Sequence, residues 1–235
     1  MRYSGLLFLL LSALGAWAGS PVASFTENKG QWPAQVLYRV LLPNGALFVE
    51  EQAFTYVLQS GGETHHHGTE SAHHEHEPYR EHAFRVHFTG GRATHWSGGT
   101  KQPHYENYFL GNDPAHWGTG CGVFGEVLLH EVWPGIDLRL DGSSGLKYEF
   151  ILAPGADPAM IQLRYEGHEH LSIKDGKLVV ETTAGDVVEE APYSFYTDDG
   201  VRTGIASRFH TEGDQVVFKF PQGTDPARPM VIDPT

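Results

Sequence analysis

Residues 171–188 read LSIKDGKLVVETTAGDVV, and this stretch decides the fold class of the chain. Within it, the pair Asp175-Gly176 lies between two short apolar runs. Aspartate and glycine both tolerate positive φ, so this pair is a strong signal of a tight β-hairpin turn. Gly185 marks the next turn, and a further apolar pair follows it. The stretch therefore predicts short antiparallel strands joined by tight turns.

The same signals continue on both sides of this stretch. Apolar and polar residues alternate with period two at 54–58 and 84–88, which places one face of each strand on a core and the other in water. Further apolar runs bounded by turn residues predict strands at 126–132, 136–140, 146–152, 205–209 and 216–220. The only predicted helical turn is at 157–160, with Asp157 as its N-cap. We expect an all-β fold, an antiparallel β-sandwich or barrel-like meander, formed as one domain or as two packed β subdomains.

The N-terminus has the features of a secretory signal peptide. Arg2 precedes an apolar run at 6–14 that is too short to span a bilayer, and Ala16-Trp17-Ala18 matches the small-x-small pattern that signal peptidase cleaves. We therefore expect a signal peptide at 1–18 and an all-β extracellular domain at 19–235, exported and either secreted or held at the outer cell surface. No other stretch reaches the roughly 20 apolar residues of a membrane helix, so no membrane span is expected in the mature chain.

Charge and cysteine content limit the classes of partner and chemistry. The chain carries 29 acidic residues against 16 lysines and arginines, a net charge of −13. Such a surface repels phosphate backbones, so no nucleic acid partner is expected. Cys121 is the only cysteine, so no disulfide can form within the chain and the fold depends on core burial. We expect this cysteine to be a small buried residue rather than a nucleophile.

Several longer motifs resemble a known family. They are 25–32 (FTENKGQW), 107–114 (NYFLGNDP), 133–138 (WPGIDL), 146–158 (LKYEFILAPGADP) and 228–234 (RPMVIDP). Together they resemble an uncharacterised N-terminal domain of large secreted bacterial proteins, especially those of Bacteroidota. The resemblance implies that downstream modules of the same or a related polypeptide are partners: seven-bladed β-propeller (SBBP) repeats, PKD-type repeats or a gliding-motility-associated C-terminal domain. The family carries no known activity, so the resemblance assigns no functional residues.

A histidine-rich segment at about 60–81 interrupts the strand pattern. It nearly lacks apolar residues, which predicts a mobile surface loop. Neutral imidazole binds Zn, Cu and Ni, and the candidate metal ligands are His65, His67, His74 and His76. Their spacing matches no defined zinc motif, so we favour a solvated loop over loose metal capture, and a defined metal site comes last. Beyond such weak metal binding, no cofactor is expected.

Carboxylates within the motifs raise the alternative of a hydrolase. A glycosidase places two carboxylates across a cleft, at a separation that sequence does not show. The candidates are Glu27, Asp113, Asp137, Glu149 and Glu166. Asp113, Asp157 and Asp225 each precede a proline, a context in which aspartate commonly caps local backbone N–H groups. We favour turn chemistry over catalysis, and the sequence contains no serine-hydrolase, P-loop or dinucleotide-binding motif.

Aromatic residues near the predicted turns are the remaining clue to binding. They are Trp32, Trp96, Tyr105, Tyr108, Trp117 and Trp133. Exposed rings can bind sugars by stacking, whereas buried rings anchor a core that has no disulfides, and we favour the second role.

These observations predict a non-catalytic extracellular structural or interaction module rather than an enzyme. The alternative is a module that binds carbohydrate or a transition metal, and a carboxylate-based hydrolase is the third hypothesis. The external partner expected for such a module is an extracellular glycan or protein.

Overall fold

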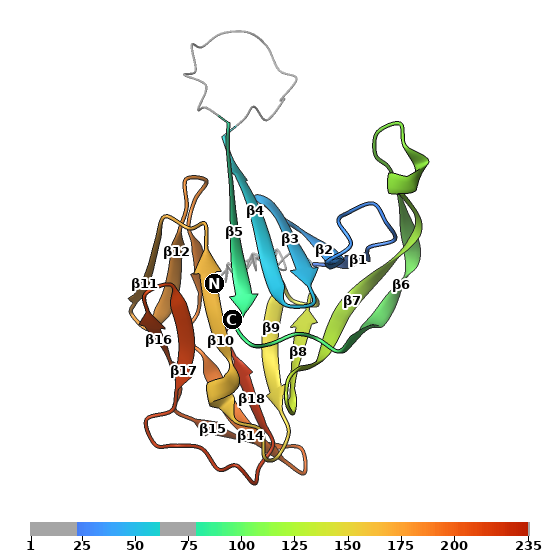
Figure 1. Ribbon diagram of the computed structural model, residues 1–235. Helices are drawn as coiled ribbons and strands as arrows, with labels where there is room; N and C mark the ends of the chain where they lie inside the picture. The colour runs from blue at the N-terminus through green and yellow to red at the C-terminus, as the bar shows by residue number, and fades with distance from the viewer. Residues whose placement is uncertain (1–22, 62–78, 235) are drawn as a thin grey trace, which may run out of the picture.

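The computed structural model describes residues 23–61 and 79–234 of the chain (Figure 1). These residues form β-strands and two short 3-10 turns, and none of them lies in an α-helix or in a helix that is long and apolar enough to cross a membrane. The elements are β1 (Phe25–Glu27), β2 (Val36–Leu42), β3 (Gly45–Glu50), β4 (Ala53–Ser60), β5 (Arg80–Phe88), β6 (His95–Phe109), η1 (Pro114–His116), β7 (Trp117–Trp133), β8 (Ile136–Asp141), β9 (Lys147–Leu152), η2 (Pro158–Met160), β10 (Gln162–Glu166), β11 (His170–Lys174), β12 (Lys177–Glu181), β13 (Val187–Glu189), β14 (Tyr193–Asp198), β15 (Val201–Ile205), β16 (Arg208–Glu212), β17 (Gln215–Lys219) and β18 (Met230–Asp233). The prediction of an all-β fold is confirmed.

Fifteen of these strands form one large antiparallel sheet. Its order is β15-β14-β18-β9-β8-β7-β1-β2-β3-β4-β5-β10-β17-β16, and β6 lies off this path, paired with β7. The other three strands, β11, β12 and β13, form a small separate sheet. Strands from both ends of the chain belong to the large sheet, which is not closed.

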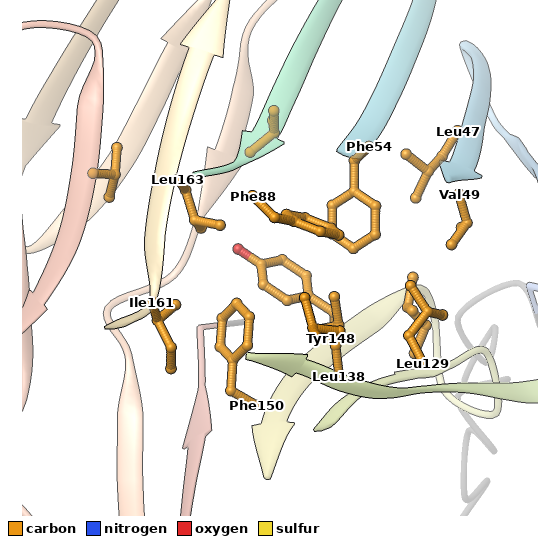
Figure 2. Close-up of a cluster of buried hydrophobic side chains, with 14 of the residues drawn as sticks. Leu47, Val49, Phe54, Phe88, Leu129, Leu138, Tyr148, Phe150, Ile161 and Leu163 are labelled. Atoms are coloured by element: carbon orange, nitrogen blue, oxygen red, sulfur yellow. The ribbon is translucent and has the colours of Figure 1, made fainter. Parts of the chain in front are cut away.

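The large sheet folds over, so that two of its parts face each other across the core (Figure 2). Side chains from β3, β4, β5 and β10 point toward side chains from β7, β8 and β9. Aromatic rings meet across this interface, with centroids 5.6 Å apart for Phe54 and Tyr148 and 5.8 Å apart for Phe88 and Trp133. The predicted period-two alternation explains the packing, because every second residue of 54–58 in β4 and of 84–88 in β5 is buried. The result is a sandwich-like core without closure into a barrel.

Residues 205–209 do not form the single strand that the sequence predicts. β15 ends at Ile205 and β16 begins at Arg208, and these two strands are the opposite ends of the strand order. Between them Ser207 donates from Oγ to the Pro192 carbonyl at 3.0 Å and accepts from Ser194 Oγ at 2.8 Å. These two contacts hold Ser207 against the segment that leads into β14. The two edge strands therefore follow each other in sequence without pairing.

The C-terminal third is also not the continuous meander that its turns predict. Its strands are divided between the small sheet (β11–β13) and the two ends of the large sheet (β14–β15 and β16–β17). The local turns are nevertheless as predicted, since Asp175 and Gly176 have φ of 51° and 82° at the tip of the β11–β12 hairpin. The predicted helical turn is present as η2, where Asp157 accepts a hydrogen bond from Ala159 N at 2.9 Å.

Candidate functional site

The predicted metal site falls in a part of the chain that the structure does not describe. Outside the described residues lie all four predicted ligands, His65, His67, His74 and His76. Ser60 pairs with Arg80 at the end of the β4–β5 ladder, so both ends of the predicted 60–81 loop belong to strands instead. Within 23–61 and 79–234, no three His, Cys, Asp or Glu side chains are grouped as a metal ion requires.

The glutamates proposed as catalytic candidates have local structural partners. Glu149 forms an ion pair with Arg139 of the neighbouring strand β8. Glu166 accepts hydrogen bonds from Arg164 at 3.1 Å and from His87 at 2.9 Å, and these two partners lower its pKa. The exposed charge pair of Glu166 with Arg164 is typical of the surface of a folded sheet.

The aspartates cap turns. Asp113, Asp157 and Asp225 each accept a hydrogen bond from the backbone N–H two residues ahead, at 3.0, 2.9 and 3.0 Å. Asp137 accepts from the backbone N–H of Glu131 at 2.8 Å and so supports a non-glycine residue at φ 51°. The predicted turn capping is confirmed for the three aspartates that precede proline.

The aromatic residues divide between the core and the surface. Trp133 is buried, and Trp32 packs edge-to-face on Tyr108 with ring centroids 5.1 Å apart. Trp96 and Tyr105 are instead 41% and 65% exposed. The anchoring role that we favoured is therefore confirmed for the first group and wrong for Trp96 and Tyr105.

Beyond the residues of β7 that pair with β1 and β8, β6 and the start of β7 form a two-stranded ribbon that extends from the rest of the sheet, and we call this ribbon with its connecting loop the arm (residues 100–122; Figure 1). Within the described strands β6 pairs with β7 alone, so its outer edge has no neighbour. The arm exposes large apolar side chains, namely Tyr105 at 65%, Phe109 at 62% and Leu110 at 48%. Phe109 packs edge-to-face on Trp117 at 5.3 Å, which gives the outer part of the arm a small aromatic cluster.

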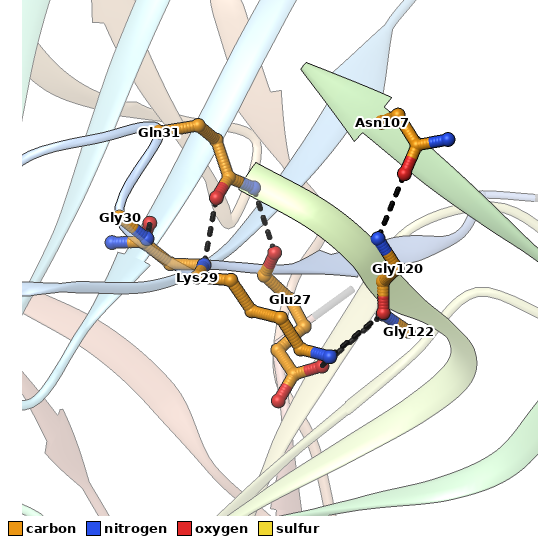
Figure 3. A network of polar contacts seen from close by, with 8 residues as sticks. Glu27, Lys29, Gly30, Gln31, Asn107, Gly120 and Gly122 are labelled. Atoms are coloured by element: carbon orange, nitrogen blue, oxygen red, sulfur yellow. Dashed lines mark hydrogen bonds and ion pairs between the residues drawn. The ribbon is translucent and has the colours of Figure 1, made fainter. Parts of the chain in front are cut away.

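A polar network joins the arm to the first strand of the sheet (Figure 3). Lys29 Nζ donates to the Gly120 carbonyl at 2.7 Å and lies 3.6 Å from Glu27 Oε2. The same Glu27 oxygen accepts from Gly122 N at 3.1 Å. Gln31 closes the turn between them, since its Nε2 donates to Glu27 O at 2.8 Å and its Oε1 accepts from Lys29 N at 2.7 Å. The FTENKGQW motif thus anchors β7 to β1.

The NYFLGNDP motif reaches the same place from β6. Asn107 Oδ1 accepts a backbone N–H of β7 at 2.8 Å, and Tyr108 packs on Trp32. The Tyr108 hydroxyl and Thr26 Oγ1 both donate to Glu106, the second at 2.9 Å. Burial and the Glu106 hydrogen bond raise the pKa of Tyr108, which keeps this hydroxyl protonated as a donor. Two motifs that lie far apart in sequence therefore meet at the base of the arm.

Cys121 lies on β7 within this region and is fully buried. Burial raises the pKa of its thiol, although Lys29 and Gln31 act in the opposite direction. The thiolate is the reactive form, so the raised pKa disfavours chemistry at this residue. The prediction of a small buried cysteine is confirmed.

A pocket of about 310 Å³ opens where β4, β9 and β13 meet the turn between β2 and β3. Its lining is mostly apolar, with Tyr56, Tyr148 and Glu189 among the polar members. Glu189 accepts hydrogen bonds from the hydroxyls of Tyr148 at 2.6 Å and Tyr165 at 3.0 Å. Burial raises the pKa of Glu189, and the two tyrosine hydrogen bonds oppose this rise.

The tyrosines around this carboxylate remain protonated. Burial, followed by the charge of Glu189, raises the pKa of Tyr148, Tyr165 and Tyr56. Our sequence reasoning missed this site. The signal that could have found it is the V-V-E run of β13, because Glu189 shares a strand face with Val187 while Val188 is 51% exposed.

The fold and these sites define the chain as an antiparallel all-β domain with a projecting arm and an acid-lined pocket. It belongs to the family described as domain of unknown function DUF7948, whose model matches residues 25–235. Comparison with curated proteins and with solved structures finds no significant match.

Proposed function

We propose that this protein is a non-catalytic interaction module and that the arm is its docking element. The observation that carries the proposal is the exposure of Tyr105, Phe109 and Leu110 on a ribbon that extends from the sheet. Folded domains rarely expose several large apolar side chains close together unless a partner covers them. Aromatic side chains are also the residues that most often dominate the binding energy of protein interfaces.

The arm is built to present these side chains in a fixed position. The network of Glu27, Lys29 and Gln31 holds its base against β1. Its free edge is interrupted by Pro103 and by Thr100, which has φ of 41°. Proline and irregular backbone discourage uncontrolled pairing with other strands. Recognition therefore falls to the side chains of the arm.

The occupant that we propose is a neighbouring module of the same or a related polypeptide. The motifs that resemble the N-terminal domain of secreted modular Bacteroidota proteins include the two that meet at the base of the arm. We accordingly place the domain at the head of an exported, cell-surface or secreted polypeptide, followed by propeller repeats, PKD-type repeats or a gliding-motility-associated domain. The leader-like features at 1–18 support the export.

Hydrogen exchange of the arm tests this proposal. Exchange at residues 104–110 is measured in the polypeptide as its native cell exports it, and in the purified chain 19–235. Docking of the arm predicts slower exchange in the native polypeptide, and Phe109→Ser with Leu110→Ser is expected to abolish the difference. Val201→Ser, which replaces an exposed apolar residue on β15, is the matched control. Equal exchange in the two samples would refute docking through the arm.

Carbohydrate binding is the second candidate, and the observation that favours it is the exposure of Trp96, Tyr105 and Phe109 on one strand. Stacking of sugar rings on such side chains predicts binding on a glycan array that Tyr105→Ala weakens. An array without signal removes this candidate.

Transition-metal capture by His65, His67, His74 and His76 is a third proposal. Calorimetry with Zn, Cu and Ni before and after deletion of residues 62–78, which leaves β4 and β5 complete, tests it. A binding heat that remains after the deletion would show that the metal binds outside this segment.

A further inference from the structure

We propose that the pocket beside Glu189 binds an alkylammonium group, that is, a positively charged amine on an apolar stem. This site is separate from the arm, so the inference stands or falls independently of the proposed function. Three features of the pocket carry it: a half-buried carboxylate without a cation among the described residues, a described lining without positive charge, and apolar walls of suitable size.

The first feature is the charge balance of Glu189. Two other enclosed carboxylates of the described chain have an arginine, since Glu50 pairs with Arg85 at 2.5 Å and Glu149 pairs with Arg139. Glu189 accepts only from two tyrosine hydroxyls among the described residues. A buried carboxylate is costly unless a positive charge accompanies it. A ligand cation would supply the charge that the fold leaves out.

The geometry of this carboxylate leaves room for that cation. A carboxylate offers about four lone-pair sites, and the hydroxyls of Tyr148 and Tyr165 occupy one on each oxygen. The remaining sites can accept N–H groups from a ligand in the adjoining pocket. Because both tyrosines stay protonated, they hold the carboxylate oriented for this contact.

The charges that line the pocket favour a positively charged ligand. Among the residues that the structure describes, no lysine, arginine or histidine lines it, whereas Asp186 lines it together with Glu189. An anionic ligand such as a carboxylate or phosphate would meet two like charges and no donor cation. A cation is instead attracted by both carboxylates, more strongly by Glu189 because Asp186 is exposed to solvent.

The apolar walls and the volume of the pocket indicate which stem the ammonium group carries. Leu42, Leu58, Leu146 and Val187 surround the space with aliphatic surface, which suits the methylene stem of an amine. A volume of about 310 Å³ is at the lower end of the range for small-molecule sites. The site therefore fits a short alkylamine or a single lysine side chain of a peptide.

Binding of a cation here is coupled to the ionisation of Glu189. The groups that face it are Tyr148 from β9, Tyr165 from β10, Tyr56 from β4 and Asp186 from its own segment. The tyrosines do not titrate near neutral pH, because burial raises their pKa above 10. A bound cation favours the charged carboxylate, so binding releases a proton and strengthens as pH rises through the folded pKa of Glu189.

Calorimetric titration of the whole protein tests the proposal with two probes, n-butylammonium and Nα-acetyl-lysine N-methylamide. 1-Butanol and butyrate are the neutral and anionic controls. Both ammonium probes are expected to bind, and the controls are not. Nearly equal affinities would assign the site to free amines, whereas tighter binding of the lysine derivative would assign it to a peptide side chain.

Two variants locate the binding. Glu189→Gln is expected to weaken ammonium binding at least ten-fold and to abolish proton release, which buffers of different ionisation enthalpy report. The matched control is Glu190→Gln, because Glu190 pairs with Lys177 at 2.7 Å and does not line the pocket. Val188→Phe narrows the pocket at a 51% exposed position and gives an independent readout if the first variant unfolds. Absence of ammonium binding, equal binding of butanol, or unchanged affinity in Glu189→Gln or Val188→Phe would overturn the inference.

Discussion

Replacement of Tyr148 by phenylalanine removes the shorter of the two hydrogen bonds to Glu189, and its effect on stability is expected to depend on pH. This hydroxyl lies 2.6 Å from the carboxylate, against 3.0 Å for Tyr165. A hydrogen bond to a charged acceptor contributes about 1.5–3 kcal/mol, and one to a neutral group about 0.5–1.5 kcal/mol. We therefore expect Tyr148→Phe to lower the free energy of unfolding by about 2 kcal/mol where Glu189 is ionised, and by about 1 kcal/mol at pH 4.

The sign follows from the direction of the pKa shift. The pKa of Glu189 is raised in the folded state, so this group favours folding below its unfolded pKa, and that contribution is lost as pH rises through the folded value. Removal of a donor to the charged form raises the folded pKa further. The variant should therefore lose more stability than the wild type as the pH increases.

Urea denaturation at pH 4, 6 and 8.5 measures the effect, with Tyr193→Phe as the control because Tyr193 is 53% exposed. In a Glu189→Gln background residue 189 cannot ionise, so Tyr148→Phe should lower the free energy of unfolding by the same amount at all three pH values. The same loss of stability in Tyr148→Phe at every pH, or a loss below about 0.5 kcal/mol at pH 8.5, would refute the role assigned to this hydrogen bond.

Three further results are expected. Gly45→Ala should destabilise the protein by about 3 kcal/mol or more in thermal unfolding, because its Cβ would lie 2.0 Å from the Val57 carbonyl oxygen; a folded variant of wild-type stability would contradict the geometry. Arg85→Met should lower the free energy of unfolding by about 3–5 kcal/mol in chemical denaturation, because it leaves Glu50, which is 4% exposed, without its cation. An unchanged free energy of unfolding would contradict this role of Arg85. Cys121 should react with a thiol reagent only under unfolding conditions, and rapid labelling of the native protein would show that it is accessible.

Local chemistry was readable from the sequence wherever the determining interactions lie within a few residues. The Asp175-Gly176 turn, the cap at Asp157 and the alternating burial at 54–58 and 84–88 all formed as predicted. The break between β15 and β16 was not readable, because Ser207 is held by Ser194 and Pro192, which lie more than ten residues away in the chain. The pattern at 205–209 is apolar enough for a strand, and only those partners turn it into a corner.

The sequence by itself determined that this chain is all-β, that it forms no internal disulfide, and that its turns are placed by glycine, aspartate and proline. These are properties of backbone sterics and of side-chain periodicity, which neighbouring residues settle. Only the tertiary structure decided which strands became edges, that the motifs around Lys29 and Asn107 meet at the base of the arm, and that Glu189 faces Tyr148 and Tyr165 across two sheets. Such contacts join residues that are distant in the chain, and their formation depends on how the whole sheet folds over its core rather than on any local pattern.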